Sequence, residues 1–105
     1  MDVTYVSFVT NKIFIKNVQP ELIQSIKDLG GRELDESTDY VLEFTGENEK
    51  IRLFTVLRDM GVAFSGGRDW SPSEQFEDLR DKGLITGKYK HIVWWGPGKY
   101  HVNER

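Results

Sequence analysis

The residues best suited to binding chemistry lie near the C-terminus, where flat aromatic side chains alternate with lysines. Stacking surfaces beside positive charge suit single-stranded nucleic acid or a hot spot for a protein partner. In a strand, Trp94 and Trp95 must point to opposite faces, so at least one of them should pack into the core or over a sheet edge. The predicted binding residues, grouped around a Gly-Pro-Gly turn, are Trp94, Trp95, Lys99, Tyr100 and His101.

Patterns of catalytic or metal-binding residues do not occur in the sequence. His91 and His101 are the only histidines and there is no cysteine, so a zinc site would need distant carboxylates. No G-x-G-x-x-G or GK[ST] pattern marks a nucleotide site, and the serines near Gly66 lack a triad signature. The acidic run from Glu33 to Asp39 is more typical of a solvated loop than of a metal cage. The sequence therefore predicts a protein without enzymatic activity, cofactor or metal.

Length and composition limit the architecture. A chain of 105 residues, 38% hydrophobic and 30% charged, is long enough for one core and too short for two. No apolar run approaches the roughly 20 residues that span a bilayer, and the N-terminus lacks a basic start followed by an apolar core. The absence of cysteine fits a reducing compartment. We expect one domain over residues 1–105, cytoplasmic or otherwise intracellular, with no membrane contact.

The net charge of −3 conceals an asymmetry along the chain. Residues 19–83 hold fifteen acidic and eight basic side chains, whereas the two flanks together hold six basic residues and only Asp2 and Glu104 as acids. Nonspecific nucleic-acid binders usually carry a dense basic stripe, so any such patch here must be small. The acidic middle is read as solvated helix faces, or alternatively as a surface that masks a basic partner.

Local patterns predict alternating strands and helices. Strands are expected at 3–9, 12–16, 40–44, 62–64, 89–95 and 100–102, with an aromatic hairpin over 88–103. Helices are expected from Pro20 to the Gly30-Gly31 pair, over 46–60, and over 73–82 with Ser71 or Ser73 as its cap. The run Ile13-Phe14-Ile15 is apolar without alternation, which is typical of a central strand covered by helices on both faces.

The segment from Ile13 to about Ile85 resembles a BRCT domain, particularly the type found in bacterial DNA ligases. The matching stretches are KIFIK, LIQSIKDLGG with its double glycine, STDYVLEF, LRDMGVAF and SPSEQFEDL. The resemblance covers about two thirds of the chain and implies an α/β fold with a core over about 12–85. That core would be a small, mainly parallel four-stranded sheet flanked by three helices, with helices on both faces and extra terminal strands. It also implies a binding role in DNA-repair or replication complexes.

The chain departs from this family at the phosphate site. Phosphate-binding BRCT domains have a serine or threonine followed by glycine just after the first strand, and a lysine on the second helix. Here the first strand ends in Lys16-Asn17-Val18, and Lys50 lies about a turn early on the second helix. Asn17 and Lys50 remain the candidates for holding an anion, through a hydrogen bond and a point charge.

A second fold fits the same elements. A ferredoxin-like β-α-β-β-α-β unit would use the same helices and pair Arg32 to Asp35 with Tyr40 to Phe44 as an antiparallel hairpin. It invites comparison with RNA-recognition modules, but YVLEF lacks the glycine and aromatic spacing of their stacking platform. The BRCT-like sheet is the preferred prediction and the ferredoxin-like fold is the alternative.

These observations converge on a non-catalytic binding module. It would recruit a protein or nucleic-acid partner through its aromatic tail and a neighbouring loop, and the BRCT resemblance implies a role in DNA repair or replication. The alternative is an acidic inhibitor or immunity-type protein that blocks a basic effector, with Glu33, Asp35 and Glu36 as the residues to test. Exposed strand edges at the two ends could also pair copies of the chain into a homodimer.

Overall fold

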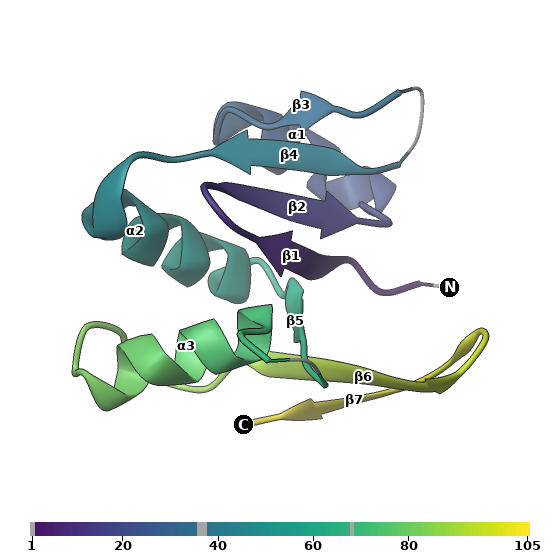
Figure 1. The fold of residues 1–105 in the computed structure, drawn as a ribbon. Coiled ribbons are helices and arrows are strands. Elements are labelled where there is room, and N and C mark those ends of the chain that lie inside the picture. Colours follow the sequence, from purple (N-terminus) through teal and green to yellow (C-terminus); the bar gives the residue numbers. More distant parts are fainter. Residues whose placement is uncertain (1, 36–37, 68) are drawn as a thin grey trace.

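Strands and helices alternate along the chain in the computed structural model, which describes residues 2–35, 38–67 and 69–105 (Figure 1). The strands are β1 (Tyr5–Val9), β2 (Lys12–Lys16), β3 (Arg32–Glu33), β4 (Tyr40–Glu43), β5 (Ala63–Ser65), β6 (Lys90–Gly96) and β7 (Lys99–Glu104). The helices are α1 (Ile23–Asp28), α2 (Gly46–Asp59) and α3 (Pro72–Asp81), and a short 3-10 turn, η1 (Pro20–Leu22), precedes α1. The predicted elements are therefore present to within a few residues at their ends.

All seven strands belong to one mixed sheet in the order β3-β4-β2-β1-β5-β6-β7. Only β1 with β5 and β5 with β6 pair in parallel, and the other neighbours are antiparallel. The predicted small, mainly parallel four-stranded sheet is therefore wrong. The main reason is β1, which is a central strand and not a terminal addition. Because only Thr10 and Asn11 link β1 to β2, these two strands pair antiparallel, and β1 also pairs with β5 on its other side.

The ferredoxin-like alternative describes one pairing correctly but not the whole sheet. Strands β3 and β4 form the antiparallel hairpin that it required, with Arg32 opposite Val41 and Glu33 opposite Tyr40. However, β1 lies between β2 and β5, and the β6–β7 hairpin extends the sheet beyond β5. The outer edge of β7 is the longer of the two sheet edges, and the homodimer predicted from the sequence would form there. That dimer stays a prediction.

The hydrophobic core lies on one face of the sheet. One cluster joins Ile26 of α1, Leu53, Phe54 and Leu57 of α2, and Phe76 and Leu79 of α3 to alternate strand residues. In β2 those strand residues are Ile13 and Ile15, whereas Lys12, Phe14 and Lys16 are only partly buried. The expectation of helices on both faces is therefore wrong, since all three α-helices pack against the same side. Among the described residues, the helices leave the opposite side of the sheet uncovered except at the start of α3, where Pro72 lines a pocket with Tyr5 and Phe8. We call this side the open face.

Caps and aromatic contacts fix the helices against the sheet. Ser71, one of the two predicted caps, is the N-cap of α3, and its hydroxyl accepts the Glu74 N–H at 3.2 Å. After α1, Gly30 has φ of 98°, which glycine adopts without strain. Phe64 of β5 packs against Phe54 of α2 and Phe76 of α3, with ring centroids 5.1 and 5.2 Å away. Among the described helices, none is long and apolar enough to cross a membrane.

Candidate functional site

The open face carries a row of aromatic side chains on adjacent strands. Phe8 of β1 lies opposite Phe14 of β2, with ring centroids 5.7 Å apart. Tyr5 of β1 meets Trp94 of β6 edge to face at 4.7 Å. Phe8 and Trp94 are 54% and 38% exposed, respectively, which is unusual for large apolar residues in the middle strands of a sheet. Simple alternation would place Phe8 on the same face as the buried Val6, but the strand register shifts between these two residues. The shift turns Phe8 to the side of Phe14, so these rings point away from the helices.

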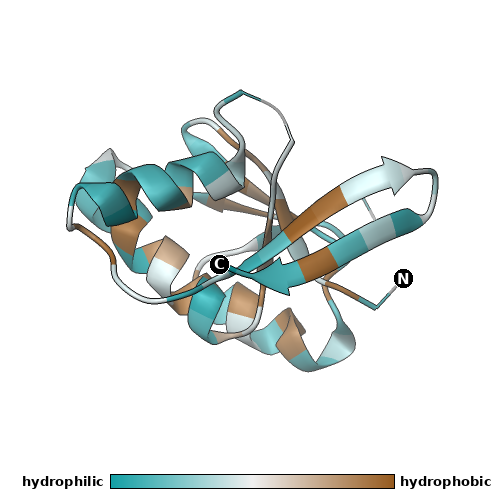
Figure 2. Ribbon diagram, turned by 90° about the horizontal axis from the view of Figure 1, so that it is seen from below, coloured by the Kyte–Doolittle hydropathy of each residue, from teal (hydrophilic) through white to brown (hydrophobic). Residues whose placement is uncertain are grey.

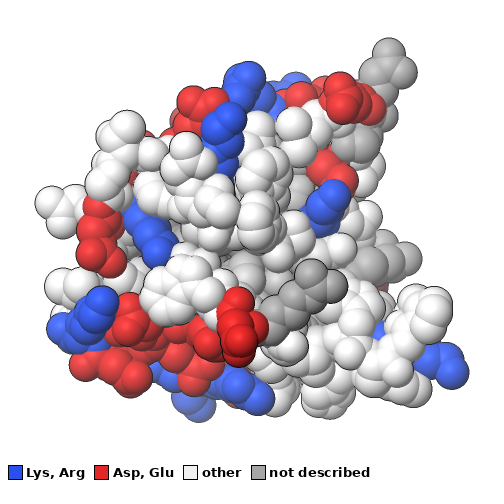
Figure 3. Space-filling view, viewed as in Figure 1, with Lys and Arg blue, Asp and Glu red and all other residues white. Residues whose placement is uncertain are grey.

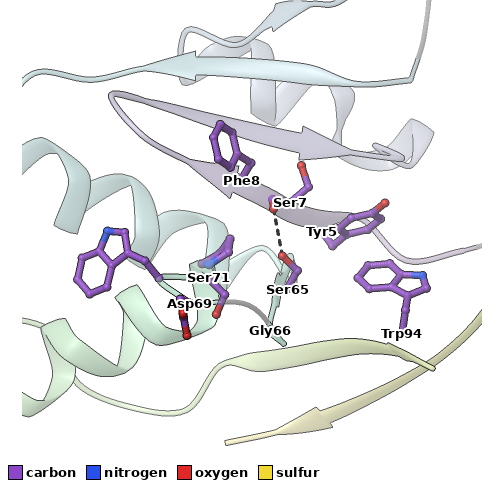
Figure 4. Close-up of a pocket in the computed structure, with 10 residues that line it drawn as sticks. Tyr5, Ser7, Phe8, Ser65, Gly66, Asp69, Ser71 and Trp94 are labelled. Carbon is purple, nitrogen blue, oxygen red and sulfur yellow. Dashed lines mark hydrogen bonds between the residues drawn. The ribbon is translucent and has the colours of Figure 1, made fainter. Parts of the chain in front are cut away.

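A pocket of about 330 Å³ opens in this face. Aromatic rings of Tyr5, Phe8 and Trp94 line it from the strands, and Trp70 lines it from the loop between β5 and α3. Its polar lining comes from Ser7, Ser65, Asp69 and Ser71. Figure 4 shows Tyr5 and Trp94 on one side, Asp69 and Ser71 on the other, and Phe8 above Ser65. We call this cavity the aromatic pocket.

The loop holds Trp70 in a costly conformation. Its φ is 56°, in the left-handed region that bulky residues rarely adopt, and its side chain is 57% exposed. Side chains of α3 hold both of its backbone polar groups. Glu74 accepts the Trp70 N–H at 3.3 Å, and the Gln75 amide donates to the Trp70 carbonyl at 3.1 Å. Strain of this kind persists where surrounding structure enforces it, and it is concentrated at functional sites.

Basic residues beside the aromatic row are balanced by acids. Lys12 and Arg32 both lie against Glu43, at 3.6 and 2.6 Å, and Lys16 pairs with Asp39 at 3.0 Å. Seen from the side of Figure 1, the middle of the surface is uncharged, and acidic side chains gather over α3 (Figure 3). The open face therefore combines exposed aromatic rings with little net charge.

The five predicted tail residues do not form one surface. Trp94 and Tyr100 are cross-strand partners on the open face, with ring centroids 6.5 Å apart. Trp95, Lys99 and His101 point to the other side of the hairpin, where the Lys99 ammonium lies 5.3 Å from the ring centroid of Trp95. Figure 2 shows hydrophobic residues in the middle of each hairpin strand and polar residues at both ends of β7. The expectation that Trp94 and Trp95 point to opposite faces is thus confirmed.

Tyr100 is tied to the N-terminal segment. Its hydroxyl donates to Asp2 at 3.0 Å, and this hydrogen bond raises the pKa of Tyr100. The contact joins residues that are 98 positions apart in the chain and holds β7 close to the start of β1.

The predicted anion-binding pair is not brought together. Asn17 follows the C-terminal end of β2, and its side chain donates to the Val3 carbonyl at 3.1 Å. Lys50 lies in α2, which starts after the end of β4 that pairs with the other end of β2. Its ammonium is 5.7 Å from the Trp70 ring centroid, and burial lowers the pKa of Lys50. Lys50 therefore supports the rim of the aromatic pocket instead of sharing an anion with Asn17.

Hydroxyl and imidazole groups between α3 and β6 belong to the interior. The Tyr89 hydroxyl donates to Glu77 at 2.6 Å and lies 3.1 Å from the Ser73 hydroxyl. Burial, followed by the hydrogen bond to Glu77, raises the pKa of Tyr89 to about 12. His91 is 3.3 Å from Asn103, and burial lowers its pKa. In the part of the chain that the structure describes, no group of three or more His, Asp or Glu side chains could hold a metal ion.

Comparison with known proteins gives no match, whether with protein-family models, curated proteins or solved structures. The BRCT resemblance therefore stays a prediction, and the fold that it implied is not the one observed. Sequence reasoning did not predict a binding role for Tyr5, Phe8, Phe14 or Trp70. Tyr5, Phe8 and Phe14 indicated only that their segments form strands. A signal was present in β2, because lysines at both ends of KIFIK share the face of Phe14.

Proposed function

We propose that this protein is a non-catalytic binding module that recruits a protein partner through the open face of its sheet. The observation that carries the proposal is the exposure of Phe8 and Trp94 around a pocket, on a sheet face that the described helices leave uncovered except at the start of α3. Exposed apolar patches of this kind are typical of interaction sites, and aromatic side chains dominate their binding energy.

The charge distribution favours a protein over a nucleic acid. Nucleic-acid affinity comes largely from cations that neutralise phosphates. On the open face, Lys12, Arg32 and Lys16 already contact carboxylates, and the chain carries a net charge of −3. An aromatic face with balanced charges resembles the centre of a protein–protein interface, where charged residues are depleted and aromatic residues are enriched.

A displayed library of random peptides, selected on the immobilised protein, tests the proposal directly. We expect the recovered peptides to lose at least about tenfold in affinity for a Phe8→Ser, Trp94→Ser double variant, because hot-spot aromatic residues contribute about 2 kcal/mol or more. Leu84→Ser is the matched control, since Leu84 is also a large exposed apolar residue but does not line the pocket. Peptides that bind the double variant as tightly as the wild type would contradict the proposal.

A second arm of the experiment examines nucleic acid. Labelled single-stranded DNA and RNA are titrated with the protein at two salt concentrations, and fluorescence anisotropy reports binding. We expect no binding that depends on Phe8 and Trp94. Binding that weakens with salt and disappears in the double variant would show that the open face binds nucleic acid, which would contradict the proposal of a protein partner.

The acidic inhibitor is a second candidate, favoured by the acidic side chains over α3 (Figure 3). Several of these acids already have partners, since Asp78 pairs with Lys82 at 3.0 Å and Glu77 lies near Arg80 and Arg105. Glu33 and Asp35 are exposed in and after the edge strand β3, and Glu36 lies outside the described residues. Charge reversal at Glu33 and Asp35 should abolish binding of a basic effector if this candidate holds, and leave the open face unaffected.

A further inference from the structure

The size of the aromatic pocket limits its occupant. Its volume of about 330 Å³ is at the lower end of ligand pockets, which run from about 300 to 1,000 Å³. The pocket is open to the surface beside Phe8 and Trp94, so a partner lying across the open face could insert a side chain (Figure 4). Rings of Tyr5, Phe8, Trp70 and Trp94 provide flat walls. The pocket therefore suits one long side chain with a planar or apolar body.

The polar lining of the pocket is rich in hydrogen-bond acceptors. The Ser65 hydroxyl donates to the Ser7 carbonyl at 3.3 Å, and the Ser7 hydroxyl donates to the Phe14 carbonyl at 3.4 Å. These two hydroxyls therefore retain lone pairs but have already used their protons. Asp69 adds a carboxylate, and no Lys, Arg or His among the described residues forms an ion pair with it. An occupant that donates hydrogen bonds therefore fits Asp69 and the hydroxyls of Ser7 and Ser65.

The charge of the described lining disfavours an anionic occupant. Among the described residues, Asp69 is the only charged side chain that lines the pocket. The N-terminus of α3 lies nearby, but Ser71 caps it and Glu74 places a carboxylate in its first turn. Among the residues that the structure describes, none that lines the pocket offers a phosphate or carboxylate a cation beside Asp69, whereas a cation would gain both the carboxylate and the faces of the aromatic rings.

From these contacts we infer that the aromatic pocket binds the guanidinium group of an arginine side chain supplied by the protein partner. The inference rests on the proposed function and names the chemistry that the open face recognises. A guanidinium stacks on aromatic faces and presents five donors, which matches the rings, Asp69 and the serine oxygens. The Lys50 ammonium lies 5.7 Å from the Trp70 ring centroid, so the face of this ring can contact a cation.

Titration of the isotope-labelled full chain with an acetylated and amidated Gly-Arg-Gly peptide, followed by NMR, tests the inference. We expect saturable shifts of the indole signals of Trp70 and Trp94 and of the backbone signal of Ser71. The same peptide with citrulline, which is isosteric and uncharged, should bind at least about tenfold more weakly. Absence of shifts at these residues with the arginine peptide would overturn the inference, as would equal binding of the citrulline peptide.

Two variants with the same change of charge separate a specific contact from general electrostatics. Asp69→Asn should weaken the arginine peptide about tenfold and leave binding of the citrulline peptide unchanged. Asp81→Asn, at the far end of α3 and outside the pocket, should change both affinities by less than about twofold. Equal effects of the two variants would overturn the inference.

Failure of this inference and failure of the proposed function give different results. Library peptides that require Phe8 and Trp94 but bind Asp69→Asn as tightly as the wild type would leave the binding module intact and remove the arginine pocket. Library peptides that ignore Phe8 and Trp94 would instead contradict the binding module itself.

Discussion

The two faces of the same sheet differ in what covers them. Ile13 and Ile15 of β2 are fully buried beneath the helices, whereas Phe14 between them is only partly buried on the open face. Likewise Phe64 of β5 lies within an aromatic cluster, while Trp94 on β6 is 38% exposed. Aromatic residues therefore serve two roles in this protein. On the covered face they stabilise the fold, and on the open face we propose that they bind a partner.

The largest expected effect comes from removing one aromatic ring from each face of the sheet and comparing the losses of stability. Phe64→Ala should lower the free energy of unfolding by about 3–5 kcal/mol, because the ring is fully buried between α2 and α3. Phe8→Ala should lower it by less than about 1 kcal/mol, because the ring is half exposed. Urea unfolding of both variants measures the difference. Similar losses for the two variants would show that the open face also stabilises the fold.

The next test compares the two faces of the β6–β7 hairpin. Trp94→Ala should weaken binding of a selected peptide by about 2 kcal/mol, because Trp94 lines the aromatic pocket. Trp95→Ala should leave that affinity within about 0.5 kcal/mol of the wild type, although Trp95 is 69% exposed. Isothermal titration calorimetry of both variants measures these affinities. A larger loss of affinity in Trp95→Ala than in Trp94→Ala would show that the peptide binds the other side of the hairpin.

The pH dependence of the unfolding free energy tests the role of Tyr89, which lies on the covered side of the sheet. Burial and the hydrogen bond to Glu77 raise the pKa of Tyr89 to about 12, so the folded state favours the protonated phenol. Its contribution to stability should be fully present below pH of about 10, the ordinary value of the unfolded chain, and should be lost as the pH rises toward 12. Unfolding free energies of the wild type and Tyr89→Phe over this range measure the effect. A parallel decline in both proteins would argue against Tyr89 as the cause.

The smallest expected effect on stability concerns the strained loop. Trp70→Gly should stabilise the fold by about 0.5–1 kcal/mol, because relief of left-handed strain of about 1–2 kcal/mol exceeds the entropic cost of glycine. The same variant should bind the arginine peptide more weakly, since it removes one wall of the pocket. Thermal unfolding and the NMR titration measure the two effects. A clear loss of stability would indicate that Trp70 is retained for packing.

Most secondary structure could be predicted from local patterns. The Ser71 cap, the Gly30 stop after α1 and the strand at 12–16 all depend on residues close together in the chain. Strand neighbours could not be predicted in this way, because pairing joins segments that are far apart. The run KIFIK illustrates the limit: its composition suggested burial on both faces, but the flanking lysines and Phe14 share the open face.

The candidate site was predictable only in part. Trp94 and Tyr100 were predicted and lie on the open face, whereas Trp95, Lys99 and His101 lie on the opposite side of the hairpin. Phe8 and Trp70 were missed, because nothing in the local sequence shows that β1 becomes a central strand or that the loop before α3 reaches it. The pocket forms where segments around residues 5, 65, 70 and 94 meet.

The sequence by itself determined the approximate positions of most strands and helices and the residues that end them, because these depend on local geometry. Only the tertiary structure decided which face of the sheet stays open. Strands β2 and β3 run opposite to β4, β5 and β6. The connection from β2 to β3 crosses the sheet in one direction, and the connections from β4 to β5 and from β5 to β6 cross it in the other direction. Right-handed crossovers then bring α1, α2 and α3 to one face. The aromatic side chains of the other face are left for a partner.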